Sequence, residues 1–139
     1  MNIHEIPNFI QVSFQEEKNY ILFDWTNFSV SLEEIQTIHH KAFETAVEKH
    51  CMYYIAETSR VKNILRPEVL DWFAKEWVPV LSAGGLKAVI TVVPLFGLAT
   101  LSTRDWQANV VSQIFQKNVR NLAEAEACIA LLQQESRNS

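Results

Sequence analysis

Two acidic residues, Asp24 and Glu57, stand where two predicted strands end. Asp24 lies at the end of the run 20–25, and Glu57 follows the apolar run 51–56. Because neighbouring parallel strands end at one edge of a sheet, both side chains are expected on the same rim, where open sheets bind ligands. A carboxylate pair can do acid–base chemistry if its surroundings separate the two pKa values. The alternative, which we favour, is that each carboxylate closes a turn by accepting hydrogen bonds from loop amides.

The histidines and cysteines do not form a recognisable catalytic or metal-binding set. His39 lies within an apolar helical stripe, whereas His40 points about 100° away on the same helix. Because metal ligands must converge, we expect His39 to be a packed, hydrogen-bonded core residue. His50 and Cys51 are neighbours at a predicted strand start, where successive side chains point to opposite faces. Cys51 and Cys128 are expected to be reduced core residues, because a reactive thiol needs a lowered pKa.

Motifs of the known catalytic classes are missing from the sequence, among them G-x-S-x-G, H-E-x-x-H and a glycine-rich phosphate loop. Gly84 and Gly85 precede a predicted strand rather than a helix, which is the wrong context for binding phosphate. No nucleophile, base and orienting group can be assembled into one set. We therefore expect no enzymatic activity and no metal.

Two apolar features are candidates for contact with a partner. Trp72 lies about 60° beyond the edge of the apolar stripe of its predicted helix, beside Trp77 within the stripe. Tryptophan is enriched at binding hot spots, although a boundary tryptophan can also cover the edge of a core. The segment 96–101, FGLATL, is compatible with a buried loop, a lid over a pocket or a dimer patch. An exposed sheet edge offers a second surface for a homodimer.

The first half of the chain predicts a hairpin followed by a strand–helix–strand unit. Residues 9–15 alternate between polar and apolar, and residues 20–25 form a second β-rich run beyond a polar turn. Ser31 and Glu34 form an S-x-x-E capping box at the start of an amphipathic helix of about 18 residues. An apolar strand follows at residues 51–56. Two strands joined by such a helix run parallel, with a right-handed crossover.

The second half predicts further helices around a buried strand. A helix starts at Pro67, because proline suits the first helical turn, and it ends at Gly84. Residues 86–93 form a continuous apolar strand, as expected when both sheet faces are covered. The stretch 95–109 is expected to be helical in its second half, and residues 110–116 to hold a last short strand. The buried stripe of the proline-led helix is expected to consist of Val69, Leu70, Phe73, Trp77, Val80 and Leu81. A C-terminal helix of roughly 14 residues is expected to bury Leu122, Ala125, Ile129 and Leu132.

This order predicts one α/β domain, bordering on α+β, over residues 1–139, with a mixed sheet of four or five strands and helices packed on it. The net charge is −4, and Lys and Arg form no cluster, which disfavours nucleic acids as partners. The first residues lack the pattern of a secretory signal, and the most apolar region, 86–101, is too broken to span a membrane. We therefore expect the protein in the cytoplasm.

Several segments, taken in this order, resemble the SpoIIAA-like branch of the STAS superfamily, small domains related to bacterial anti-sigma-factor antagonists. The resemblance covers most of the chain and depends on the order and spacing of its motifs. The matching features are Asp24 at the end of the second strand, the helix of Phe43, YYIAETSRV (53–61), the proline-led helix with Trp72 and Trp77, GGLKAVITVVP (84–94), Phe115, and Glu126 with Ala127.

The resemblance implies a four- or five-stranded mixed sheet, no cofactor and a regulatory role through protein–protein contacts. We expect the partner to bind the rim formed by residues 57–66 and the helix that follows. The candidate interaction residues are Asp24, Glu57, Ser59, Arg66 and Trp72. Ser59 matches the serine of the family's D-x-S-x-V turn, and its expected role is to cap or close the loop.

The chain departs from the family pattern at the phosphorylation switch. Antagonists switched by a kinase carry a serine at the start of the helix after this turn, but residues 63–67, NILRP, contain neither Ser nor Thr. The acidic residue of the turn is also changed, to Glu57. A more distant kinship with SEC14-type lipid-binding domains implies an alternative, a small apolar-ligand-binding domain that uses space under the segment 96–101.

Overall fold

The computed structural model describes residues 1–93 and 114–138. The elements in chain order are β1 (Asn2–Ile6), β2 (Ile10–Gln15), β3 (Tyr20–Trp25), α1 (Leu32–Glu48), β4 (Tyr53–Glu57), α2 (Pro67–Trp72), η1 (Phe73–Trp77), α3 (Val78–Ala83), β5 (Ala88–Val92), β6 (Phe115–Val119) and α5 (Leu122–Asn138). The segment 96–101 and the helix expected within 95–109 lie outside the described residues. Within the described part, no helix combines the length and the apolar character needed to cross a membrane.

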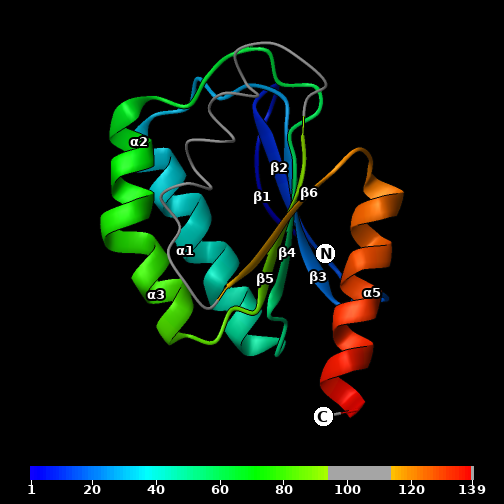
Figure 1. The fold of residues 1–139 in the computed structure, drawn as a ribbon. Coiled ribbons are helices and arrows are strands. Elements are labelled where there is room, and N and C mark those ends of the chain that lie inside the picture. Colours follow the sequence, from blue (N-terminus) through cyan, green and yellow to red (C-terminus); the bar gives the residue numbers. More distant parts are fainter. Residues whose placement is uncertain (94–113, 139) are drawn as a thin grey trace.

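The strands form one mixed sheet in the order β1–β2–β3–β4–β5–β6, which confirms the predicted α/β class (Figure 1). The pairs β1–β2 and β2–β3 are antiparallel, whereas β3, β4, β5 and β6 run parallel to one another. The predicted hairpin is therefore β2–β3, and the predicted strand–helix–strand unit is β3–α1–β4. The prediction of four or five strands was wrong, because β1 is a sixth strand whose residues are all exposed or half-buried and show no alternation.

The patterns expected for the hairpin and the first helix are confirmed. In β2, Ile10, Val12 and Phe14 are buried, and the residues between them are not. At the start of α1, the Ser31 hydroxyl accepts a hydrogen bond from the N–H of Glu34 (3.1 Å) and donates one to the Glu34 carboxylate (3.1 Å). Ser31 is therefore the N-cap that marks the start of α1, and the Glu34 carboxylate bonds to the capping hydroxyl.

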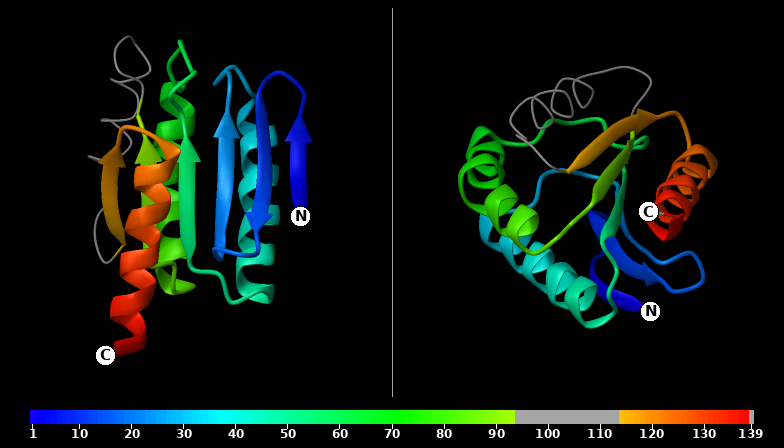
Figure 2. Two further views of the ribbon diagram at one scale, coloured as in Figure 1. Left: turned by 90° about the vertical axis from the view of Figure 1, so that its right-hand side faces the viewer. Right: turned by 60° about the horizontal axis from the view of Figure 1, so that its bottom comes forward.

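Helices cover both faces of the sheet. α1, α2, η1 and α3 pack on one face, and α5 packs on the other (Figure 2). This cover on two sides explains why all five residues of β5 are buried and why four of them are apolar, Thr91 being the exception. The core under α5 is built around Ile55, Ile90 and Ile129, and the predicted stripe of α5 faces it.

The proline-led helix is interrupted by a π-helical turn, η1. Pro79 has no N–H to donate to the carbonyl of Lys75, and its ring would collide with that carbonyl in a regular α-helix. In the wider turn, the N–H of Val78 donates to the carbonyl of Phe73, five residues earlier. The extra residue rotates the buried stripe, so Val78 is buried, and Val80, which was predicted inside, is 42% exposed.

The last strand is displaced from the predicted segment 110–116, part of which lies outside the described residues. β6 is Phe115–Val119 and pairs in parallel with β5, with Val119 opposite Val92. Of its five residues, Val119 alone is buried. An edge strand of this kind is held by backbone pairing, so its sequence, FQKNV, carries no apolar pattern that would mark it.

Candidate functional site

The rim comprises the carboxyl-terminal ends of β3 and β4 together with the loops that follow them, residues 26–31 and 58–66. It lies at the top of the molecule in Figure 1. Asp24 and Glu57 are directly paired residues in the parallel register of β3 and β4. The expectation that both carboxylates share one rim is therefore confirmed.

Both carboxylates are engaged by residues of the rim itself. Glu57 Oε1 accepts one hydrogen bond from the N–H of Ser59 (2.9 Å) and a second from the Ser59 hydroxyl. Asp24 Oδ1 forms an ion pair with Nη2 of Arg60 (2.5 Å), a residue that the sequence analysis did not single out. Glu57 and Ser59 thus close the turn after β4, while Asp24 links the end of β3 to the β4–α2 loop.

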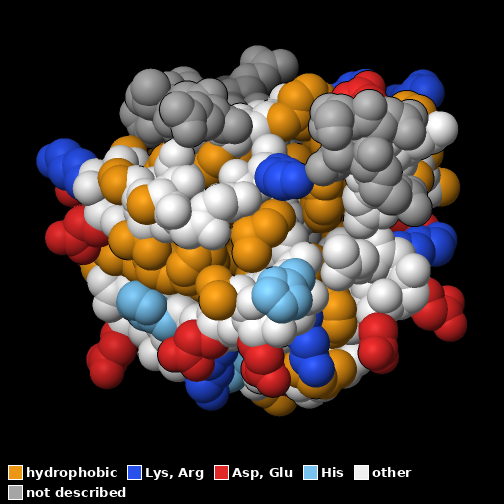
Figure 3. Space-filling view, turned by 90° about the horizontal axis from the view of Figure 1, so that it is seen from below, with side chains coloured by type: hydrophobic (Ala, Val, Ile, Leu, Met, Phe, Trp, Pro, Cys, Tyr) orange, Lys and Arg blue, Asp and Glu red, His pale blue; other side chains and the backbone are white. Residues whose placement is uncertain are grey.

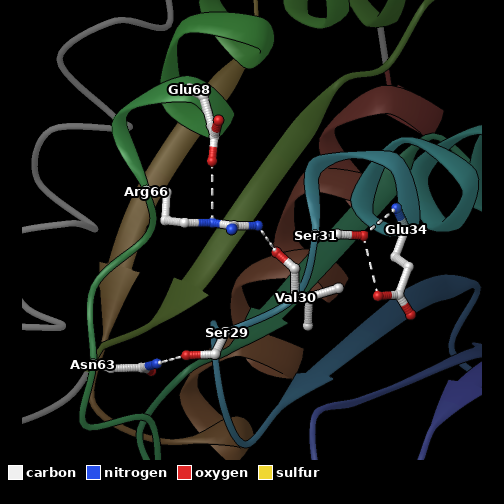
Figure 4. A network of polar contacts seen from close by, with 7 residues as sticks. All are labelled: Ser29, Val30, Ser31, Glu34, Asn63, Arg66 and Glu68. Atoms are coloured by element: carbon white, nitrogen blue, oxygen red, sulfur yellow. Dashed lines mark hydrogen bonds and ion pairs between the residues drawn. The ribbon is translucent and has the colours of Figure 1, made fainter.

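Asn63 ties the two rim loops together (Figure 4). Its side-chain N–H groups donate to Asn27 Oδ1 (2.9 Å) and Ser29 Oγ (2.8 Å). Its side-chain carbonyl accepts a hydrogen bond from the N–H of Phe28 (3.0 Å). The sequence alone does not mark Asn63, because its bonding partners belong to a loop about 35 residues earlier and no local pattern identifies them.

Arg66 adds a second link between the loops. Its Nη2 donates to the carbonyl of Val30 (2.5 Å), and its Nε lies 3.3 Å from Glu68 Oε1 (Figure 4). Val30 directly precedes Ser31, so this link reaches the capped start of α1. The predicted rim residue Arg66 therefore braces the loops, while its side chain remains 46% exposed.

The outer surface of the β4–α2 loop is basic and apolar. Ile64 is a large hydrophobic residue that is 46% exposed. Two exposed cationic residues flank Ile64 in the sequence, Lys62 before it and Arg66 after it. The Arg60 side chain is 60% exposed even though it pairs with Asp24. The loop thus exposes one large apolar side chain and three cations, two of which are paired with carboxylates, Arg60 with Asp24 and Arg66 with Glu68.

Trp72 does not lie on the surface of the rim. It is 8% exposed and stacks on Trp77, with ring centroids 5.4 Å apart and ring planes at 15°. The rings of His39 and Phe73 lie 6.0 Å and 5.1 Å from it. A side chain buried to this extent offers no anchor to a partner, so Trp72 separates from the other four candidate rim residues and belongs to the core.

A cavity of about 80 Å³ lies between the sheet and the helical layer of α1, η1 and α3. Its lining is mainly apolar and includes the rings of Phe23, Trp25 and Phe28. The polar side chains on its lining are those of His39, Tyr54, Thr58 and Thr91. The Thr58 hydroxyl donates to the carbonyl of Val92 (2.8 Å), so it is already bonded.

His39 and Tyr54 present polar atoms that are not bonded. Both ring nitrogens of His39 and the hydroxyl of Tyr54 are buried without a hydrogen-bond partner among the residues that the structure describes. His39 is thus a packed core residue as expected, but the hydrogen bonds expected for it are not made there. Burial, and secondarily the charge of His40, lowers the pKa of His39 to about 3, and burial raises the pKa of Tyr54. Both groups are therefore neutral at pH 7.

Hydrophobic side chains also gather at the opposite end of the molecule, on the side of α1 and α3 (Figure 3). Val47 of α1 and Val80 of α3 are 50% and 42% exposed. Between these two helices, the ring of Phe43 packs edge-on against Trp77, with centroids 5.9 Å apart. This apolar surface is distinct from the rim.

Both cysteines are free thiols. Cys51 precedes β4 instead of opening it, is fully buried, and donates to the carbonyl of Tyr53 (3.7 Å). Burial raises the pKa of this thiol, which suits a core residue. Cys128 is partly buried against the core under α5. Across residues 1–93 and 114–138, no group of three or more His, Cys, Asp or Glu is arranged to hold a metal ion.

The resemblance to the SpoIIAA-like branch, which depends on sequence motifs alone, stays a prediction after comparison with known proteins. No protein-family model, curated protein or solved structure is significantly similar to the chain.

Proposed function

We propose that this chain is a non-catalytic regulatory module that binds a protein partner through the rim, the role that the resemblance to anti-sigma-factor antagonists implies. The observation that carries the proposal is the bracing of both rim loops by Asn63 and Arg66. Loops held in this way lose little conformational freedom on binding, so more of the contact energy is retained as affinity.

The chemistry of the rim favours an acidic partner surface with an apolar recess. Ile64 supplies an exposed apolar side chain. The exposed cations of the same loop are Arg60, Lys62 and Arg66, of which Arg60 also pairs with Asp24 and Arg66 with Glu68. Complementary charges speed association and select the partner, while the apolar contact at the centre of an interface contributes most of the affinity.

Binding in this proposal does not depend on the phosphorylation switch of the family. Residues 63–67 contain no hydroxyl side chain that a kinase could modify. The position of that segment is taken by the bracing residues Asn63 and Arg66. The rim is therefore proposed to be competent to bind without modification.

The test is affinity capture from native cell extract with the tagged full chain, followed by titration of the purified partner. We expect Ile64→Ser to weaken binding about 5- to 30-fold, the effect of removing a central apolar contact. Lys62→Glu is expected to slow association and to reduce the salt dependence of binding.

Leu131→Ser is the matched control, because Leu131 is 61% exposed on α5, on the other face of the sheet. It should bind the partner as the wild type does. Equal affinity of the wild type, Ile64→Ser and Lys62→Glu would show that the rim is not the binding surface.

A further inference from the structure

The apolar surface at the end of the molecule opposite the rim is continuous across two helices (Figure 3). Phe43 and Val47 are four residues apart on α1, so they are neighbours on one side of that helix. The ring of Phe43 fills the space beside Gly84, and the N–H of Gly84 donates to the carbonyl of Val80 (2.9 Å). Val47 of α1 and Val80 of α3, which are 50% and 42% exposed, therefore belong to one surface.

Carboxylates flank these apolar side chains. Glu44 precedes Val47 by three residues and is its neighbour on the surface of α1, and Glu48 directly follows it. Glu76 of η1 lies four residues before Val80. All three carboxylates are exposed, and no ion pair among the described residues involves them. We call the whole set the basal surface: Phe43, Glu44, Val47, Glu48, Glu76 and Val80.

The nearby cations do not neutralise the basal surface. Lys49 lies two residues after Val47, about 200° further around the helix, and therefore on the other side of α1. Lys75 pairs with Asp71 (2.9 Å). Lys87, just before β5, is exposed and balances one carboxylate at most. The basal surface therefore keeps an excess of negative charge around its apolar side chains.

The rim has the complementary chemistry. Its exposed apolar side chain is Ile64, and Lys62, two residues before it, is exposed and takes part in no ion pair among the described residues. Arg60 and Arg66 are paired, but their side chains remain 60% and 46% exposed. One end of the molecule thus presents an apolar side chain with cations, and the other end presents apolar side chains with carboxylates.

The two surfaces lie at opposite ends because of the parallel sheet. The rim is at the carboxyl ends of β3 and β4, where α1 begins, and α1 carries the chain back to the amino end of β4 (Figure 1). The end of α1 and the end of α3 therefore lie away from the rim. A single molecule cannot bring its own rim and basal surface together, whereas two molecules can.

We propose that the protein partner of the rim is a second copy of this chain, which presents its basal surface, so that the molecules associate head to tail. This inference rests on the proposed function of the rim as a protein-binding surface. The contact joins two different surfaces, so each pair of molecules still has one free rim and one free basal surface. Further copies add at both ends, and the product is an open chain of molecules rather than a closed symmetric dimer.

The first test is sedimentation velocity of the purified full chain over a concentration series, at low and at high salt. We expect the mean mass of the wild type to rise with concentration beyond the mass of a dimer. High salt should oppose this rise, because it screens the attraction between the cations of the rim and the carboxylates of the basal surface. Lys62→Glu should weaken self-association and reduce its dependence on salt.

A complementary pair of variants identifies the two surfaces. Ile64→Ser impairs the rim alone, and the double variant Val47→Ser, Val80→Ser impairs the basal surface alone. Each should self-associate about 5- to 30-fold more weakly than the wild type, the effect of removing a central apolar contact. An equimolar mixture of the two should form 1:1 pairs with the affinity of the wild type and nothing larger, because one intact rim meets one intact basal surface.

Leu131→Ser is the matched control, because it removes an exposed apolar side chain of α5 that belongs to neither surface. It should self-associate as the wild type does. Unchanged self-association of Ile64→Ser alone would indicate contact between two basal surfaces, and unchanged self-association of the double variant alone would indicate contact between two rims. Either result, or a mixture that forms no pairs, would overturn the head-to-tail arrangement.

The outcome for the wild type separates this inference from the proposed function. A wild type that remains monomeric at every concentration would overturn the inference. The proposed function would still be decided by the effect of Ile64→Ser on a partner captured from extract, since that experiment does not require self-association.

Discussion

His39 is surrounded by aromatic rings, and this surrounding sets its charge. It stacks on Phe23 at 20° between ring planes, and Phe73 meets it edge-on, with centroids 4.7 Å apart. Trp72 and Trp77 lie 6.0 Å and 6.2 Å away. An apolar environment of this kind disfavours the imidazolium ion, which is why the pKa of His39 falls to about 3.

The low pKa makes a prediction for stability against pH. The unfolded chain binds a proton at His39 below about pH 6.5, whereas the folded protein does not until about pH 3. Between these values, acidification therefore favours unfolding, by about 1.4 kcal/mol per pH unit from this residue. Above pH 6.5 the contribution does not change with pH.

Urea unfolding of the wild type and of His39→Phe at pH 4, 5, 6 and 7 measures this slope. The difference in unfolding free energy between the two proteins should change by about 1.4 kcal/mol per pH unit from pH 6 to pH 4 and level off towards pH 7. Subtracting one unfolding free energy from the other cancels the pH-dependent contributions of the carboxylates, because both proteins contain the same carboxylates. Parallel stability curves over this range would contradict the assignment of a buried, neutral His39.

At the scale of elements, the contact between α1 and the end of α3 depends on a glycine. A Cβ atom at Gly84 would lie 2.1 Å from Cζ of Phe43, so the ring of Phe43 occupies the space that a side chain would need. Gly84 has φ −79°, a conformation that any residue adopts. Glycine is therefore needed at position 84 because a side chain would not fit there, and not because of the backbone conformation.

Gly84→Ala is expected to lower the unfolding free energy, because two effects oppose each other and the larger one is steric. Removing a glycine stabilises by about 0.4–1 kcal/mol through the unfolded state. Forcing a methyl group into a filled space costs about 1–3 kcal/mol. The net loss can be measured by urea denaturation.

A double-mutant cycle with Phe43→Ala isolates the contact. In the Phe43→Ala background, Gly84→Ala should be neutral or stabilising, because the ring that it meets is gone. The same loss in both backgrounds would mean that Phe43 is not the obstacle.

At the scale of the whole molecule, α5 is fastened to the face of the sheet that the other helices leave free. The Tyr20 hydroxyl donates to Glu126 Oε2 (2.6 Å), and Lys18 Nζ lies 2.9 Å from Glu126 Oε1. The side chain of Gln133 donates to the carbonyls of Lys18 and Asn19 (3.0 and 3.2 Å). These bonds join α5 to the turn between β2 and β3, more than 100 residues earlier in the sequence.

Tyr20→Phe is expected to lower the unfolding free energy by about 1–3 kcal/mol at pH 7, because it removes a hydrogen bond to a carboxylate. The Tyr20 hydrogen bond is also the largest cause that lowers the pKa of Glu126, so that pKa should rise towards its ordinary value in the variant. A lowered carboxyl pKa stabilises at neutral pH and is lost on acidification, so the difference between wild type and variant should shrink in acid.

Tyr54→Phe is the matched control, because it removes a buried hydroxyl that has no partner among the described residues. It should leave the unfolding free energy unchanged or raise it slightly. Equal losses in the two variants, measured by urea denaturation, would show that the Tyr20–Glu126 bond does not fasten α5.

Much of the fold follows from local patterns in the sequence. Alternation marked β2, the capping box of Ser31 and Glu34 marked the start of α1, and the apolar run of β5 indicated cover on both faces. The shared rim of Asp24 and Glu57 followed from the strand–helix–strand unit, because such units are parallel and right-handed. Each of these depends on residues close together in the chain.

Other features are decided by contacts between distant segments. β1 and β6 are edge strands held by backbone pairing, which leaves no apolar signature in the sequence. The links of Asn63 to the β3–α1 loop and the burial of Trp72 arise only when α2 packs beside α1. The absence of hydrogen bonds to the His39 ring nitrogens among the described residues also follows from tertiary packing. Periodicity predicts that a residue lies on the inner face of a helix, but it does not identify the groups that the residue contacts there. Only the tertiary structure shows that this packed histidine also lines a cavity.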